Sequence, residues 1–159
     1  MKKSPLFLYC IGTFLLIIFL AVGYWYSRHN LNFTCSSSTA SFYTNKGNVP
    51  FLNYTQSVSF THSGKAYVHI SGNIHDAEKM YALNRTIIYS YERIAPTEYR
   101  MQVLTASYAG SDSVPEAMEK KYLMPILPGI ERIFGIRQLP TGDMVISNNS
   151  GPFLICAVH

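Results

Sequence analysis

Hydrophobic and polar positions divide this chain into two parts with different patterns. From Leu6 to Val22 the residues are almost all apolar, with no Lys, Arg, Asp or Glu among them. Further along, apolar and polar residues alternate with a period of two over short segments bounded by turn residues. The continuous run predicts one N-terminal helix, and the alternation predicts strands that each bury one face.

The apolar run can be read as a cleaved signal peptide or as a retained anchor. Ala21-Val22-Gly23 is a small-x-small triplet that signal peptidase accepts. However, the run is longer than the roughly 7 to 15 residues of a signal h-region, and Tyr24-Trp25-Tyr26 lies where a membrane-interface belt would lie. We therefore expect an uncleaved transmembrane anchor over residues 6–26. Residues 1–5 would then form a cytoplasmic N-terminus, and residues 27–159 an exported β-rich domain.

The clearest hairpin lies in residues 52–75. One apolar face is formed by Leu52, Tyr54, Val58 and Phe60 in the first arm and by Ala66, Val68, Ile70 and Ile74 in the second. The two apolar faces lie on the same side of the hairpin only if the two residue numbers in each pair are both even or both odd. A three-residue turn, His62-Ser63-Gly64, gives such pairs. The predicted pairs are Phe60 with Ala66, Val58 with Val68, Gln56 with Ile70, Tyr54 with Gly72, and Leu52 with Ile74.

A second hairpin is predicted from residues 79–95 and 97–109, with its turn at Ile94-Ala95-Pro96. Its apolar face comprises Tyr81, Leu83, Ile87, Tyr89 and Tyr91 in the first arm and Tyr99, Met101 and Val103 in the second. Arg85 falls on the same face. Either a bulge or strand-end exit turns Arg85 outward, or the side chain points inward beside an anionic group. We favour the outward orientation, because unpaired buried arginine is rare.

One helix and three further strands complete the pattern. Ser113 and Glu116 form a capping-box spacing, and Val114, Met118 and Tyr122 repeat on one helical stripe that ends before Pro125. About seven or eight strands with one short helix predict a mainly β fold, either a β-barrel or a strongly curved antiparallel sheet.

Charge and motifs exclude several functions. Without Lys2 and Lys3 the 13 Lys and Arg residues fall to eleven, against 9 Asp and Glu, so no nucleic-acid-binding footprint is present. No phosphate loop, nucleophile elbow or His-Glu-x-x-His motif occurs. We predict no catalytic residues, no metal site and no cofactor, and we interpret His62, His69 and His75 as ordinary exposed histidines.

The three cysteines lie in different contexts. Cys35 and Cys156 stand near the start and the end of the exported part, which in an oxidising compartment predicts a disulfide between the first and last strands. Two separate buried thiols are the alternative. Cys10 lies inside the apolar run, where we interpret it as a small hydrophobic residue.

Two features indicate binding. The predicted inward faces are rich in tyrosine, a suitable lining for an amphipathic small ligand such as a steroid or lipid, although a solid tyrosine-rich core fits equally well. The candidate ligand-lining residues are Tyr54, Val58, Phe60, Val68, Ile70, Tyr81, Tyr89, Tyr91, Tyr99 and Met101. The last predicted strand is apolar on both faces, which suggests docking to a protein partner through Phe153, Leu154, Ile155 and Val158, or double coverage within the fold.

The layout of Lys2-Lys3, one anchor, Cys35, a compact strand-rich domain and Cys156 resembles the FidL-like family of small enterobacterial inner-membrane proteins. These proteins look like counterparts of ToxS-type partners of ToxR-like, membrane-bound winged-helix regulators. The resemblance implies a periplasmic lipocalin-like barrel whose edge is completed by the regulator, with sensing of bile-salt-like ligands. The alternative is a membrane-anchored carrier of a lipid or small molecule, or an assembly factor, without a signalling role.

Overall fold

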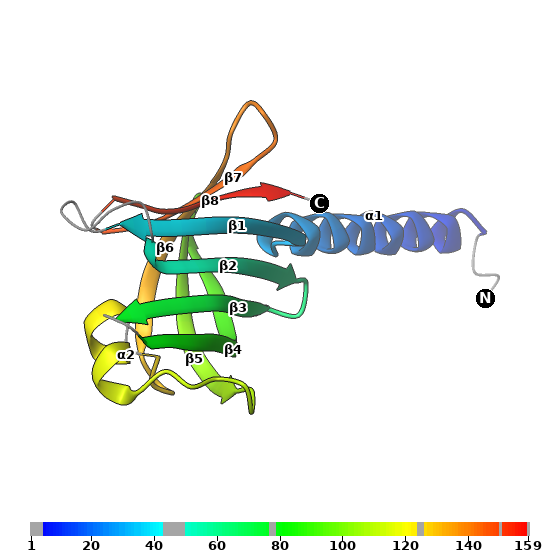
Figure 1. The fold of residues 1–159 in the computed structure, drawn as a ribbon. Coiled ribbons are helices and arrows are strands. Elements are labelled where there is room, and N and C mark those ends of the chain that lie inside the picture. Colours follow the sequence, from blue (N-terminus) through cyan, green and yellow to red (C-terminus); the bar gives the residue numbers. More distant parts are fainter. Residues whose placement is uncertain (1–4, 43–49, 77–78, 124–125, 150, 159) are drawn as a thin grey trace.

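The computed structural model describes residues 5–42, 50–76, 79–123, 126–149 and 151–158, which form eight strands and two helices (Figure 1). The elements are α1 (Pro5–His29), β1 (Phe33–Phe42), β2 (Pro50–Thr61), β3 (Lys65–Asp76), β4 (Lys79–Ala95), β5 (Glu98–Tyr108), α2 (Glu116–Tyr122), β6 (Glu131–Gln138), β7 (Met144–Asn148) and β8 (Gly151–Val158).

The strands form a closed barrel in which each strand pairs antiparallel with the next and β8 returns to β1. This is the up-and-down order found in small ligand-binding barrels. The predicted mainly β barrel is therefore confirmed, and the strand predicted over residues 79–95 coincides with β4. In Figure 1, α1 extends from one end of the barrel and α2 lies at the other end.

The predicted register of the first hairpin is confirmed at every pair. Phe60 faces Ala66, Tyr54 faces Gly72 and Leu52 faces Ile74. Gly64 closes the turn with a φ of 74°, a conformation that suits glycine. At Gly72 a Cβ atom would collide with the carbonyl oxygen of Asn53, because the two strands approach closely there.

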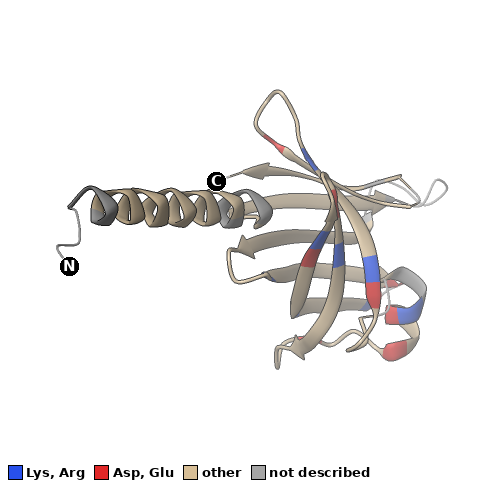
Figure 2. Ribbon diagram, turned by 180° about the vertical axis from the view of Figure 1, so that it is seen from behind, with Lys and Arg blue, Asp and Glu red and all other residues tan. Residues whose placement is uncertain are grey.

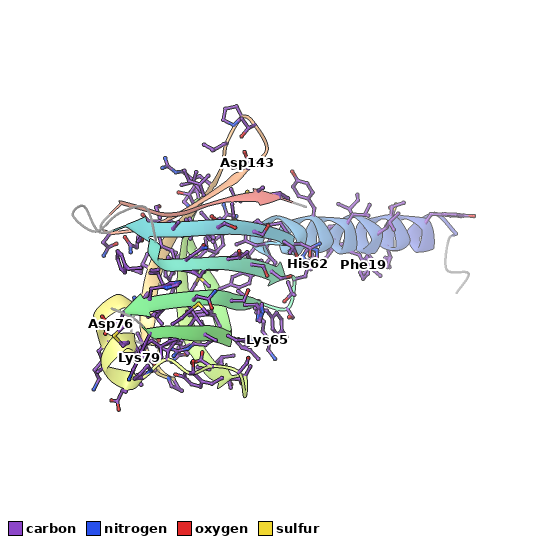
Figure 3. The ribbon with its side chains drawn as sticks, in the orientation of Figure 1. Phe19, His62, Lys65, Asp76, Lys79 and Asp143 are labelled. Carbon is purple, nitrogen blue, oxygen red and sulfur yellow. A yellow bond between two sulfur atoms is a disulfide. The ribbon has the colours of Figure 1, made fainter. Side chains whose placement is uncertain are left out.

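The interior of the barrel contains two groups of buried side chains. The larger group surrounds the disulfide between Cys35 and Cys156, whose Cα atoms lie 5.4 Å apart, so the predicted disulfide is confirmed. Phe60, Tyr91 and Tyr99 pack edge to face in this group. The smaller group contains Leu52, Ile74 and Met118 and lies beneath α2. Figure 3 places His62 at the barrel end next to α1, and Asp76 and Lys79 at the end that carries α2.

The helix α1 overlaps the anchor predicted over residues 6–26. Its described side chains, residues 9–25, are all exposed, including those of Phe14, Phe19 and Trp25. None of them is charged (Figure 2). Among the helices of the described residues, none is long and apolar enough to cross a membrane.

The start of α2 differs from the prediction. The residue that caps the helix is Pro115, without a side-chain cap hydrogen bond, so the predicted capping box is wrong. The hydroxyl oxygen of Ser113 instead accepts a hydrogen bond from the backbone N–H of Ala82 at 2.9 Å. Ser113 therefore ties the segment before α2 to β4. The helix ends at Tyr122, before Pro125 as predicted, and the side chain of Tyr122 lies outside the described part.

Candidate functional site

The main candidate site is a cavity of about 150 Å³ inside the barrel, at the end that carries α2. Its walls combine the inner faces of β2 to β6 with the segment that follows α2 and one residue of β8. The lining residues are Tyr54, Gln56, Val68, Ile70, Leu83, Arg85, Ile87, Tyr89, Val103, Leu123, Ile126, Ile130, Arg132, Phe134 and Phe153. The lining is mostly apolar with a few polar groups, which is the usual make-up of a small-molecule site.

Arg85 points into the barrel, so the favoured outward orientation is wrong. Its side chain is 2% exposed. Its Nε donates to Asp112 Oδ2 at 2.8 Å and its Nη2 donates to Asp112 Oδ1 at 3.3 Å. Nη1 lies 3.0 Å from Glu119 Oε2, an ion pair whose angle falls outside that of a hydrogen bond. The register shifts in this hairpin lie between Ile88 and Tyr89 and between Arg93 and Ala95, so neither falls at Arg85.

Opposite charges hold both sides of this cluster in their ionised forms. Burial, the largest influence, lowers the pKa of Arg85, but Asp112 and Glu119 together raise it above its usual value. Burial likewise raises the pKa of Asp112, yet the hydrogen bonds from Arg85 and from the backbone amides of Asn84 and Val114 bring it below its usual value. The guanidinium carbon of Arg85 also lies 4.5 Å from the centre of the Tyr108 ring.

The segment between β5 and α2 docks on β4 through this cluster. Besides binding Arg85, Asp112 accepts the backbone N–H of Asn84 at 3.0 Å. The backbone N–H of Ala109 donates to the carbonyl of Asn84, and that of Ser113 to the carbonyl of Ala82. Because Leu123 and Ile126 follow in the chain and line the cavity, the Arg85 cluster holds one wall of the cavity in place.

The ten candidate ligand-lining residues fall into three groups. Four lie in the cavity wall: Tyr54, Val68, Ile70 and Tyr89. Five belong to the solid group around the disulfide instead: Val58, Phe60, Tyr91, Tyr99 and Met101. Tyr81 packs against the small group beneath α2. The interior is thus solid at one end and hollow at the other.

Tyr91 illustrates the solid end of the barrel. Its hydroxyl lies 2.7 Å from the carbonyl oxygen of Thr61 and 3.0 Å from that of Leu31. The ring is 7% exposed and the hydroxyl is committed to backbone acceptors, so this tyrosine has a structural role.

The sequence did not identify several groups at the hollow end: Asp112, Glu119, Gln56 and Arg132. Gln56 and Arg132 each occupy an inward position in the alternation of their strands, which was the available signal. Arg132 pairs with buried Met101, and directly opposed residues of antiparallel strands point to the same side.

A second candidate site is the seam where β8 meets β1. In the described part of the chain this ladder contains two residue pairs, Cys35 with Val158 and Ser36 with Ala157. By contrast, the ladder between β1 and β2 runs from Phe33 to Phe42. The disulfide crosses the same seam. The remaining parts of both strands therefore form a sparsely paired edge of the barrel.

The four residues of the candidate partner-binding strand do not share one environment. Leu154 is buried against the interior at 5% exposure, whereas Ile155 is 58% exposed and Phe153 and Val158 are 39% and 40% exposed. Val158 pairs with buried Cys35 and so lies on the inner face with Leu154, Phe153 reaches the interior cavity, and Ile155 points to the open outer face. Phe153 also contacts Phe134, with ring centres 6.1 Å apart.

Fold and site together define a small up-and-down β-barrel with an interior cavity and a weakly paired seam between β1 and β8. A family model described as "FidL-like putative membrane protein" matches residues 72–156, more than half of the chain. The chain belongs to the FidL-like family. It matches no curated protein and no solved structure at a significant level.

Proposed function

We propose that this protein is a non-enzymatic accessory protein of the bacterial inner membrane. It binds and stabilises the periplasmic domain of a ToxR-like, membrane-bound winged-helix regulator, and it responds to a small amphipathic ligand. The observation that carries the proposal is the seam between β1 and β8. Among the described residues, two pairs join these strands, which are ten and eight residues long.

A sparsely paired seam suits recognition by strand addition. The backbone groups at the edge supply hydrogen bonds to an incoming strand, and neighbouring side chains supply specificity. Ile155, which is 58% exposed, adds apolar surface beside this edge. The disulfide at the seam keeps β1 and β8 in register while the rest of the edge accepts a partner.

Membrane attachment through α1 agrees with this role. The family description reads "putative membrane protein", and the side chains of α1 over residues 9–25 are exposed and uncharged (Figure 2). Attachment would raise the local concentration of the barrel around a regulator in the same bilayer. With α1 in the membrane, the end of the barrel that carries α2 and the cavity faces away from the bilayer (Figure 1).

The test is co-expression with a ToxR-like, membrane-bound winged-helix regulator, followed by co-purification and measurement of the regulator's lifetime. Ile155→Lys should reduce the recovered complex at least tenfold, because a charge would be buried at the seam. Ile133→Lys is the matched control, since Ile133 is similarly exposed at 43% but lies on β6, which is paired on both sides. Equal loss in both variants, or in neither, would refute the seam as the docking site.

The alternative is a membrane-anchored carrier of a lipid or other small molecule without a signalling role. The interior cavity favours it only for a small cargo. A cavity of about 150 Å³ is well below the roughly 300 to 1,000 Å³ of sites for drug-sized ligands. A carrier would co-purify with its cargo and without a protein partner.

A further inference from the structure

The lining of the interior cavity consists mainly of hydrocarbon side chains. Ten of the fifteen lining residues are Val, Leu, Ile or Phe, contributed by several strands and by the segment after α2. The neutral polar groups in the lining are the hydroxyls of Tyr54 and Tyr89 and the carboxamide of Gln56. A lining of this kind favours a ligand that is mostly apolar and carries a small polar group.

The charged side chains of the lining are already engaged within the protein. Arg85 is paired with Asp112 and Glu119, which bring two negative charges to its one positive charge. Arg132 also has an interaction partner in the structure. The described residues that line the cavity include no Asp or Glu that could balance a cation. Because burying an unbalanced charge is costly, the ligand should be neutral.

The volume limits the size of the ligand. A cavity of about 150 Å³ is the size of an engineered apolar cavity that holds one benzene molecule. A ligand with a single ring therefore fits this space. A steroid nucleus consists of several fused rings, so the steroid or bile-salt-like ligand expected from the sequence is too large for the cavity in this structure.

Phe153 lies at the boundary between the cavity and solvent. The ladder between β7 and β8 shifts register here, which leaves Phe153 between the pairs formed by Pro152 and Leu154. Its ring lines the cavity and contacts Phe134, yet the residue is 39% exposed. A rotation of this ring would open the cavity on the side of β8 without breaking a residue pair to β7.

We propose that the cavity binds one neutral single-ring molecule with a small polar group such as a hydroxyl, and that the ring of Phe153 is the gate through which it enters. The ligand ring would pack against Val68, Ile87 and Val103, and its polar group would form a hydrogen bond with the hydroxyl of Tyr89. Burial raises the pKa of Tyr89 more than Arg132 lowers it, so this hydroxyl stays protonated and neutral. The inference rests on the ligand-responsive part of the proposed function and names the class of ligand.

The test uses the full chain in lipid nanodiscs with isotope-labelled methyl groups of Ile, Leu and Val. Phenol is the probe, benzoate and benzylammonium are its charged analogues, and equilibrium dialysis fixes the free concentration of each. Phenol should shift the methyl signals of Val68, Ile87 and Val103 and leave those of Val58, in the solid group around the disulfide, in place. The charged analogues should need at least about tenfold higher free concentrations, because each would bury an unbalanced charge.

Filling the cavity assigns the binding to it. Val103→Phe and Val68→Phe each place a ring in the empty volume, so each should lower the affinity for phenol at least about tenfold. The two residues lie on different strands, so the second variant remains a test if the first does not fold. Leu104→Phe is the matched control, because Leu104 is next to Val103 on β5 and is 42% exposed.

The gate is tested by the rate at which phenol exchanges. Phe153→Ala should speed exchange of bound phenol at least about tenfold, measured from the line shapes of the cavity methyl signals. Ile155→Ala is the matched control, because Ile155 lies on the same strand and is exposed on the outer face. Equal exchange rates in the two variants would reject Phe153 as the gate.

Three outcomes would overturn the ligand class: no shift of the cavity methyl signals with phenol, equal potency of phenol and benzoate, or unchanged affinity for phenol in both filled variants. Partner binding is measured separately by co-purification with the seam variants. Loss of phenol binding in the wild type with an intact complex would reject the ligand inference alone. Absence of the complex with intact phenol binding would reject the partner role alone.

Discussion

Arg85 on β4 and Asp112 in the segment after β5 form a buried ion pair, joined by hydrogen bonds of 2.8 and 3.3 Å. The two side chains are 2% and 4% exposed. Because Asp112 also accepts backbone N–H groups of Asn84 and Val114, one carboxylate holds β4 and the start of the α2 segment together. The wall of the cavity therefore depends on a contact between residues distant in sequence.

Removing the charge of Asp112 should strongly destabilise the protein. Asp112→Asn keeps the side-chain shape but leaves Arg85 with incomplete neutralisation in the barrel. Breaking one partner of a buried pair typically costs about 3–5 kcal/mol, and Glu119 should keep the loss at the lower end. Urea unfolding followed by circular dichroism measures the change. The control is Glu92→Gln, which breaks the exposed contact of Glu92 with Arg100 and should cost about 0–1 kcal/mol. Similar costs for both variants would contradict a structural role for the Arg85 cluster.

The same pair predicts a loss of stability in acid. The pKa of Asp112 is lower in the folded protein than its usual value, so the folded state favours the ionised carboxylate. This contribution is fully present above the unfolded pKa of about 3.9 and is lost as pH falls through the lower folded pKa. Melting temperatures between pH 7 and pH 2 should therefore fall less steeply below pH 4 in Asp112→Asn than in the wild type. Parallel curves for the two proteins would reject this linkage.

Local alternation accounts for what the sequence predicted well. The pairing of Tyr54 with Gly72 followed from parity across one short turn, and the faces of β4 and β5 followed from the period of two. The environment of Arg85 could not be predicted in the same way, because its partners Asp112 and Glu119 come from a later segment and a helix. The extent of the predicted cavity could not be derived for a related reason. Tyr54 and Phe60 share one inward face, and only the packing around each side chain decides that Tyr54 lines the cavity and Phe60 belongs to the solid core.

Gly72 should not tolerate a side chain. A Cβ atom there would approach the Cα of Tyr54 and the carbonyl oxygen of Asn53 far inside van der Waals contact. Since these are backbone atoms of a paired strand, Gly72→Ala should cost about 1–3 kcal/mol through overpacking. Gly110→Ala is the matched control, because a Cβ atom at Gly110 meets nothing within 4 Å. Thermal unfolding of the two variants measures the difference. A Gly72→Ala protein as stable as Gly110→Ala would show that the strands move apart at little cost.

The disulfide should contribute a large part of the stability of the barrel, because it links residues 121 positions apart across the weakly paired seam. For a loop of this length the chain-entropy estimate is about 4–5 kcal/mol. Replacing both cysteines, Cys35→Ala with Cys156→Ala, should lower the free energy of unfolding by about that amount, less if the seam ladder is strengthened by a bound partner strand. Cys10→Ala is the control, since Cys10 is a free, exposed thiol on α1. Thiol titration of the denatured, unreduced wild type should find one free thiol, and three would contradict the bond. If the double variant also loses the proposed complex with a regulator while Cys10→Ala retains it, the disulfide acts at the seam by holding β8 beside β1 for the incoming strand.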